Sequence, residues 1–437
     1  MIDELLQTGA SAHDSVPYLR SVTDMAERCA VVTQDAIYSA SGIKLVDKGA
    51  RIDSRMYDRL VRHKLREPMD THLTVDNAVT LQVVQQAAAD MCASDSLAAL
   101  LSQALGSPDA LVAPLQQAVL PARLGFKLTV MREQMPDLFA HSLRMMLVAL
   151  YLGLRSRMDA RACADLAAAG LLHDLGALHM DPAWRDPRHR PTGAARKHLI
   201  AHPVTAMLMV RDVQAYDSTV EEAILEHHER MDGTGYPRSL QGRDISPMGQ
   251  ILLLAEVVAA FYEKYPDQPA QQLSLMLRLN HRKFPAPLVA HVLPLLYEES
   301  GAGPHRAMPT HGQLQSLGAQ LTQAFDQWEQ VKQDMGPDQP PPQGPLAFVN
   351  ERLGMLKRAL AEAGAHPQQH EVLLQQLQGD DEGLSELAYV VREALWQLES
   401  IANGCQRRWP HLLEQRDSPE AAAAARWCDW VRSLGTP

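Results

Sequence analysis

Short apolar runs separated by polar turns mark the first part of the chain. Residues 29–53, CAVVTQDAIYSASGIKLVDKGARID, contain β-branched pairs interrupted by two Gly-containing turns, which is the pattern of small strands joined by tight connections. The next stretch, SRMYDRLVRHKL at 54–65, has helical spacing. Residues 1–75 are therefore expected to form a small α/β N-terminal unit.

From residue 76 onward the apolar positions follow helical periods. Residues 76–120 are rich in Ala, Leu and Gln and contain no Pro or Gly before Gly106, which favours a helical connector. Residues 121–300 resemble consecutive helices separated by polar loops such as DPAWRDPRHRPTG. This middle segment is expected to be an all-helical domain.

The last part of the chain is also expected to be helical. Residues 301–345 are predicted to form one helix followed by the linker GPDQPPPQGP at 336–345, since proline disrupts both helices and central strands. Residues 346–437 are predicted to form a helical bundle with two apolar stripes. The stripes are Leu346, Val349, Leu353, Leu356 and Leu360, and Leu384, Leu387, Val391, Leu395 and Leu398. Core packing is the favoured interpretation of these stripes, and a surface that binds a protein partner is the alternative.

Composition narrows the function classes. The net charge of -11 and the pI near 5.9 give no support for electrostatic binding to nucleic acid or to an anionic membrane. The five cysteines lack metal-type or disulfide-rich spacing, which is typical of a reducing compartment. No uninterrupted apolar run reaches the roughly 18 residues that a membrane span requires. A cytoplasmic protein is therefore expected.

Potential metal ligands recur at intervals through the middle segment. Imidazole and carboxylate groups together suit first-row divalent ions such as Fe, Mn or Zn. A His-Asp pair adds a specific capability, because a carboxylate has two oxygens and can bridge two cations while the neighbouring imidazole binds one. Two metal ions so placed can activate water and stabilise both oxygens of a phosphoryl displacement. The candidates are His141, His173, Asp174, His202, His227, His228 and Glu256.

The motifs around these residues resemble those of the HD-GYP family, the bacterial branch of the HD phosphohydrolases that hydrolyses cyclic di-GMP. The matching motifs are HSLR at 141–144, HDLG at 173–176, HPVTAM from 202, HHERMDGTGYP at 227–237 and AE at 255–256. The eleven-residue motif is the most specific of these. The resemblance covers about 175 of the 437 residues and implies an HD-type all-helical domain.

The resemblance also implies roles for the matched positions. The seven candidates take the places of the family's metal ligands, with Asp174 as the bridging carboxylate and His173 beside it in the catalytic centre. Asp137 stands four residues before His141, where some members place a Glu that helps to hold a third metal. Two or three divalent ions, iron or manganese, are thus implied. Gly233, Gly235, Tyr236 and Pro237 match the loop that shapes the substrate cleft.

Several positions depart from the family pattern. Ala177 replaces a Lys that contacts substrate phosphate in other members, KYPDQ at 264–268 replaces a basic segment, and Glu256 replaces an Asp. The further departures are Gln250 for an Arg and Ala259 for a second Asp. Because phosphoryl transfer depends on positive charge around the transferred oxygens, a weaker phosphate clamp is expected. The cations that could compensate are Arg144, Arg238 and Lys264.

Three hypotheses follow. The first is a metal-dependent phosphodiesterase that hydrolyses cyclic di-GMP. The second is a catalytically impaired module that acts as a nucleotide receptor or protein scaffold, with a partner on its C-terminal helices. The third is a hydrolase of a different phosphorylated compound. The intact ligand set favours the first and third, whereas Ala177 and the altered basic segment favour the second and third.

Overall fold

The computed structural model describes residues 15–180, 193–265, 269–299, 310–334, 344–416 and 418–434. Contacts divide the chain into two compact units. The first comprises the chain up to Lys264 together with Phe284–Leu295, and the second comprises Tyr265–Lys283 and the chain from Leu296 onward. The loop DPAWRDPRHRPTG and the proline-rich linker fall almost entirely outside the described residues. The structure is 73% helix and 4% strand, which confirms the prediction of a mainly α protein.

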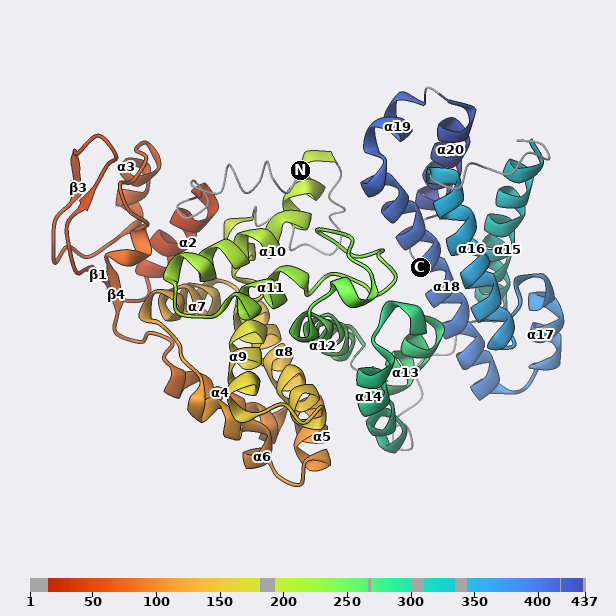
Figure 1. Ribbon diagram of the computed structural model, residues 1–437, viewed down its shortest axis with the longest axis horizontal. Helices are drawn as coiled ribbons and strands as arrows, with labels where there is room; N and C mark the ends of the chain where they lie inside the picture. The colour runs from red at the N-terminus through yellow and green to blue at the C-terminus, as the bar shows by residue number, and fades with distance from the viewer. Residues whose placement is uncertain are drawn as a thin grey trace. The chain divides into compact units, whose positions relative to one another are not determined.

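The first unit begins with the small α/β arrangement that was predicted (Figure 1). Strand β1 pairs antiparallel with β4, with Val31 opposite Val75, and β2 pairs antiparallel with β3, with Ile37 opposite Val46. Gly49, which lies in a turn here, has φ +78°, a conformation that glycine adopts without steric cost. The elements are α2 Val16–Ala26, β1 Val31–Thr33, β2 Ile37–Tyr38, β3 Lys44–Val46, α3 Tyr57–Val61 and β4 Leu73–Val75.

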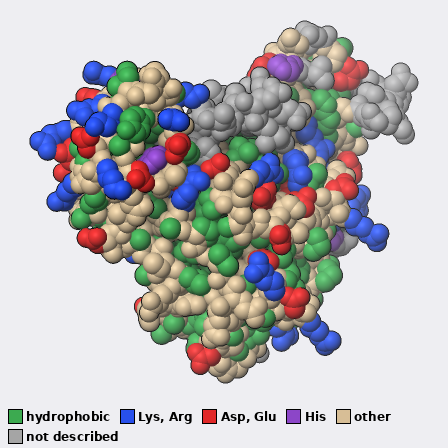
Figure 2. Space-filling model, turned by 60° about the vertical axis from the view of Figure 1, so that its left-hand side comes forward, with side chains coloured by type: hydrophobic (Ala, Val, Ile, Leu, Met, Phe, Trp, Pro, Cys, Tyr) green, Lys and Arg blue, Asp and Glu red, His purple; other side chains and the backbone are tan. Residues whose placement is uncertain are grey.

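Charged side chains on this part of the surface are mixed in sign. Lys44 pairs with Asp47 at 2.6 Å and Lys48 with Asp35 at 3.4 Å. Figure 2 shows Lys and Arg side chains interspersed with Asp and Glu on the face that it displays. Interspersed charges of both signs do not build the long-range positive potential that attracts nucleic acid.

The remainder of the first unit is helical. Its helices are α4 Leu81–Ser94, α5 Ser96–Ala104, α6 Pro108–Val112, α7 Ala122–Gln134, α8 Pro136–Arg155, α9 Ala160–Leu172, α10 Gly193–Val213, α11 Ser218–Glu226 and α12 Pro247–Lys264, with the 3-10 helix η5 Leu175–His179 and most of α14 Ala286–Glu299. Helix α8 packs against both α9 and α12. Residues Met145–Leu152 on α8 are almost completely buried.

Helix α8 is long and apolar enough, by length and composition alone, to cross a bilayer. However, 72% of its 18-residue apolar stretch is buried inside the protein. A core helix of a globular domain gives the same signal. Its burial is explained here by contacts with its neighbours.

The second unit is helical throughout its described residues. Its helices are α13 Pro269–Leu279, α15 His311–Asp334, α16 Pro345–Glu362, α17 His370–Gln376, α18 Asp381–Arg408, α19 Pro410–Gln415 and α20 Pro419–Ser433. Most residues of the two predicted apolar stripes are buried in one hydrophobic core. Trp328 and Trp427 meet edge to face in this core with ring centroids 5.4 Å apart. The stripes therefore serve core packing.

Candidate metal centre

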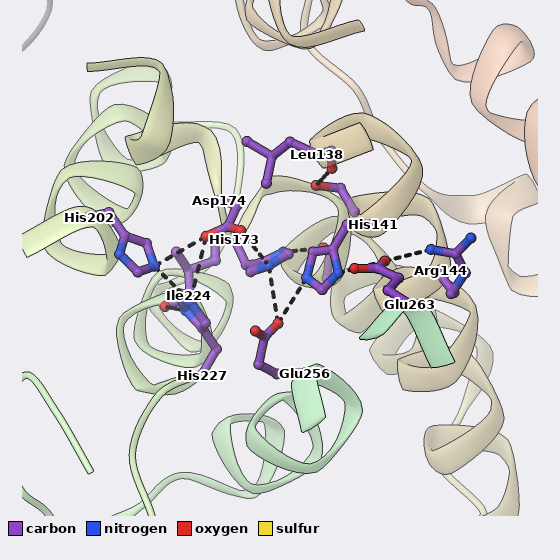
Figure 3. Close-up of polar contacts among 12 residues, drawn as sticks. Leu138, His141, Arg144, His173, Asp174, His202, Ile224, His227, Glu256 and Glu263 are labelled. Carbon is purple, nitrogen blue, oxygen red and sulfur yellow. Dashed lines mark hydrogen bonds and ion pairs between the residues drawn. The ribbon is translucent and has the colours of Figure 1, made fainter. Parts of the chain in front are cut away.

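Five helices of the first unit bring the predicted ligands to one place (Figure 3). His141 lies on α8, His173 caps the C-terminus of α9 and is followed by Asp174, and His202 lies on α10. His227 caps the C-terminus of α11 and is followed by His228, while Glu256 lies on α12. The ligand atoms form two groups, in each of which they lie within 4.8 Å of one another. The groups are His202, His227 and His228, and His141, His173 and Asp174.

The Asp174 carboxylate lies between the two groups. Its Oδ2 is 3.3 Å from His173 Nε2, whereas its Oδ1 is 3.1 Å from His202 Nε2 and 3.8 Å from His227 Nε2. Each oxygen therefore faces the imidazoles of a different group. A carboxylate in this position can bridge two cations.

Glu256 closes the centre on the side of α12. Its Oε2 is 3.0 Å from His141 Nε2 and 3.5 Å from His173 Nε2. The extra methylene of Glu, relative to the Asp of the family pattern, still lets the carboxylate reach the imidazoles. Glu256 can therefore act as a ligand despite the substitution.

Backbone carbonyls fix the orientation of three imidazoles. His173 Nδ1 is 2.8 Å from Gly170 O, His202 Nδ1 is 2.6 Å from Leu199 O, and His227 Nδ1 is 2.6 Å from Ile224 O. A carbonyl can only accept, so each Nδ1 carries the proton and donates it. When Nε2 carries no proton, each ring presents the Nε2 lone pair to the centre, which is the tautomer that binds a metal.

The residues present fit divalent metal ions. His173 is completely buried, and its Nε2 makes no well-aligned hydrogen bond, although carboxylate oxygens of Asp174 and Glu256 lie 3.3 and 3.5 Å away. A buried polar atom without a partner is costly, and a metal ion would satisfy this lone pair. The nitrogen and oxygen donors suit first-row divalent ions, and among the described residues neither ligand group includes a cysteine that would favour softer metals.

Charge coupling perturbs the ionisation of the ligands strongly. Burial alone would lower the pKa of His173, but the carboxylates of Asp174 and Glu256 outweigh it and raise that pKa to about 9. Burial, with the neighbouring imidazoles His173 and His202, lowers the pKa of His227 to about 3. Burial would raise the pKa of Asp174, but His173 and His202 hold it well below its usual value. Without metal, the carboxylates of Asp174 and Glu256 thus favour the protonated form of His173. A metal ion that binds His173 Nε2 must displace this proton.

Glycine at position 176 lets two ligand-bearing segments approach closely. A Cβ on residue 176 would lie only 2.1 Å from the carbonyl oxygen of His202. Helix η5, which follows Asp174, packs against α10 at this point. Gly176 therefore allows Asp174 and His202 to meet.

Two buried carboxylates hold the segment that directly follows the DGTGYP loop. Glu229, which is completely buried, accepts hydrogen bonds from the backbone N–H of Arg238 at 2.7 Å and of Leu240 at 3.0 Å. Glu226 is also buried and accepts from the Arg238 guanidinium. The loop then folds back onto the ligands, because Tyr236 stacks on His228 with ring centroids 4.6 Å apart.

The structure does not bring every predicted site residue into this centre. Asp137 is exposed on the first turn of α8 and is absent from both ligand groups. Arg144 is ion-paired with Asp95 and Glu263, and Arg238 with Glu226. Gly235 and Pro237 lie in the loop beside Tyr236, and Lys264 is an exposed residue at the end of α12.

Two residues near the centre were missed by sequence reasoning. Glu263 is 2.9 Å from His141 Nδ1, and its position seven residues after Glu256 on the same helix was a signal, since such residues share a face. Arg230 lies two residues after His228, donates to Glu229 O at 2.7 Å and stacks over the Phe284 ring at 5.8 Å. Among the residues that the structure describes, no carboxylate forms an ion pair with Arg230.

Known proteins share this segment. Residues 129–283 match the HD domain family. The 3'3'-cGAMP-specific phosphodiesterase 3 of Vibrio cholerae is 31% identical over 135 residues, which cover 30% of this chain and 29% of that protein. The cyclic di-GMP phosphodiesterase PA4108 of Pseudomonas aeruginosa is 28% identical over 132 residues, which cover 29% of this chain and 31% of that protein.

These matches span about a third of the length of each curated relative. A solved structure, Bd1817, a HDG"Y"P protein from Bdellovibrio bacteriovorus, is 17% identical and covers 61% of this chain and 95% of its own, with a TM-score of 0.35. The HD domain match over residues 129–283 and the relatives named above support an HD-GYP or HD phosphohydrolase family for this segment of the chain.

Proposed function

We propose that this chain is a metal-dependent phosphodiesterase that hydrolyses a cyclic dinucleotide, with cyclic di-GMP as the expected substrate. The observation that carries the proposal is the placement of Asp174, whose two oxygens face two different groups of imidazoles. His141, His173 and Glu256 would hold one ion, His202, His227 and His228 the other, and Asp174 would bridge them.

The chemistry of the centre supports a phosphodiester substrate. Two divalent ions held about 3.5 to 4 Å apart lower the pKa of a water between them and stabilise both the attacking and the leaving oxygen. The chain itself supplies the orientation of the imidazoles, through Gly170 O, Leu199 O and Ile224 O. It also supplies a loop, held by Glu226 and Glu229, that can frame a ligand beside His228.

The curated relatives support the substrate class. One of them is named a 3'3'-cGAMP-specific phosphodiesterase and another a cyclic di-GMP phosphodiesterase. Both substrates are cyclic dinucleotides with two phosphodiester bonds. A cyclic dinucleotide is therefore the first substrate class to test, and the two nucleotides must be compared directly.

A nucleotide receptor is the second candidate, and a specific observation favours it. Of the three cations expected to compensate for Ala177, Arg144 and Arg238 are engaged by carboxylates of the protein. An arginine whose charge is already paired contributes less to phosphate binding. A protein that retains metals but lacks a strong phosphate clamp would bind nucleotide without hydrolysing it.

The experiment compares wild type with the double variant His173→Ala, Asp174→Ala, each incubated anaerobically with Mn²⁺ or Fe²⁺. Cyclic di-GMP, 3'3'-cGAMP and a generic phosphodiester, bis(p-nitrophenyl) phosphate, are supplied separately, and products are followed by chromatography. Metal-dependent linear dinucleotide or mononucleotide from wild type alone would support the phosphodiesterase. Nucleotide binding without product at full metal occupancy would refute it and support the receptor. Turnover of the generic substrate alone would indicate another phosphorylated substrate.

A further inference from the structure

Glu263 makes an unusual contact with the metal centre. It lies in the last turn of α12, and its Oε1 is 2.9 Å from His141 Nδ1. On the other side of the same ring, His141 Nε2 is 3.0 Å from Glu256 Oε2. Figure 3 shows the His141 ring between these two carboxylates. One carboxylate thus belongs to the centre, and the other supports the ring from outside it.

His141 differs in this respect from three other imidazoles of the centre. His173, His202 and His227 each donate from Nδ1 to a carbonyl three residues earlier in their own chain segment. Their orientation is therefore set locally by helix geometry. The orientation of His141 instead depends on a side chain from a different helix, and on whatever holds that side chain.

An ion pair with Arg144 holds Glu263, and a second ion pair holds Arg144 in turn. Glu263 Oε1 is 2.5 Å from Arg144 Nη1, and Arg144 lies three residues after His141 on α8. Arg144 Nε and Nη2 are each 2.9 Å from Asp95 Oδ2. Asp95 stands at the junction of α4 and α5, where its Oδ1 also accepts from Ala98 N at 3.0 Å. A continuous polar chain therefore runs from this junction to a metal-ligand candidate.

A carboxylate in this position has two effects on a metal-binding imidazole. It accepts the Nδ1 proton, so the Nε2 lone pair is available on the side of Glu256 and His173. Its negative charge also makes the imidazole a more basic ligand, and removal of such an outer partner typically weakens metal affinity about 10–100-fold. The side chains of Arg144 and Asp95 are each 18% exposed and that of Glu263 is 34% exposed, so solvent screens the two inner members of this chain less than Glu263 itself.

We propose that Glu263 is a positioning residue of the metal centre, which sets the tautomer and orientation of His141 and is itself held by Arg144 and Asp95. The junction of α4 and α5 is then linked to metal affinity through His141. This inference rests on the proposed two-metal centre. It assigns a function to Arg144 that is different from binding substrate.

The test measures the binding of Co²⁺ and Mn²⁺ to apo protein, by calorimetry and by the visible absorption spectrum of bound Co²⁺. Glu263→Ala is expected to weaken the binding affinity for one of the two ions about 10–100-fold and to change the Co²⁺ spectrum. Glu263→Gln is expected to reduce this affinity less, because the amide oxygen can still accept a hydrogen bond from His141 Nδ1–H. Asp95→Asn is expected to shift affinity in the same direction by a smaller factor, and Asn preserves the cap of α5.

The control is Glu222→Gln, which removes one negative charge from an exposed position on α11 and should leave metal binding unchanged. Wild-type affinity and spectrum in Glu263→Ala would overturn the inference while leaving the proposed function intact. No metal binding by wild type would overturn the proposed function and the inference with it. If Glu263→Ala does not fold, the nearly isosteric Glu263→Gln decides, and wild-type affinity and spectrum in that variant would overturn the inference.

Discussion

Gly176→Ala should disrupt the metal centre by separating two ligand-bearing segments. The new Cβ would lie 2.1 Å from His202 O, whereas ordinary contacts of this kind begin at 3.4 Å. The difference, 3.4 − 2.1 = 1.3 Å, is the separation that η5 and α10 must gain. The atoms that the new Cβ meets belong to the backbone of His202 and Ala206, so no flexible side chain can move aside to relieve the contact.

The expected magnitude follows from that displacement. Overpacking of a filled interior costs about 1–3 kcal/mol of unfolding free energy, which corresponds to about 2–4 °C of melting temperature per kcal/mol for a domain of 150–250 residues. A displacement of about 1 Å in a catalytic arrangement typically costs about 100-fold in rate. Metal affinity should fall as well, because Asp174 precedes η5 and His202 lies on α10.

The assay combines thermal unfolding of the apo protein with metal content after dialysis against Mn²⁺. The matched control is Gly312→Ala, since a Cβ at Gly312 meets no atom within 4 Å and alanine favours a helix over glycine by about 1 kcal/mol. Gly176→Ala is expected to melt earlier and to retain less metal, whereas Gly312→Ala should match or exceed wild-type stability. Wild-type melting and metal content in Gly176→Ala would refute the reasoning.

Two other predictions concern the residues beside the ligands. Arg230→Gln should raise the KM for a cyclic dinucleotide at unchanged metal content, because Arg230 forms no ion pair within the described residues; an unchanged KM in steady-state kinetics would exclude it from phosphate binding. Glu229→Gln should destabilise the DGTGYP loop by about 1–3 kcal/mol, because the carboxylate accepts two backbone N–H groups in a buried position. Hydrogen exchange at Arg238 and Leu240 would report this loss, and wild-type protection there would contradict it.

The sequence predicted the helical fold, and it named the candidate ligands that the structure brings together, but it predicted less of the surroundings of the site. Motifs reveal His173, Asp174 and His227 because their chemistry and spacing are local. The partners of Arg144 come from the α4–α5 junction and from the end of α12, far away in the chain. Spacing alone therefore made Arg144 and Arg238 resemble available cations, although both are paired with carboxylates in the folded protein.

Glu263 shows the opposite case, a supporting residue that the sequence did not reveal. Its seven-residue distance from Glu256 placed it on the ligand-bearing face of the helix, but nothing local indicates that His141 would face it. Only the packing of α8 against α12 joins the two. Positions of supporting side chains depend on such tertiary contacts, which single-sequence patterns do not specify.

The most direct test of the central claim is the stoichiometry and affinity of Mn²⁺ on apo protein, for wild type and for Asp174→Asn. The substitution preserves the size of the side chain but removes the charge shared by the two groups of imidazoles. The account predicts about two ions per chain in wild type and loss of at least one in the variant, whose amide cannot bridge two cations as a carboxylate does. Absence of bound metal in wild type, or equal stoichiometry and affinity in Asp174→Asn, would contradict it.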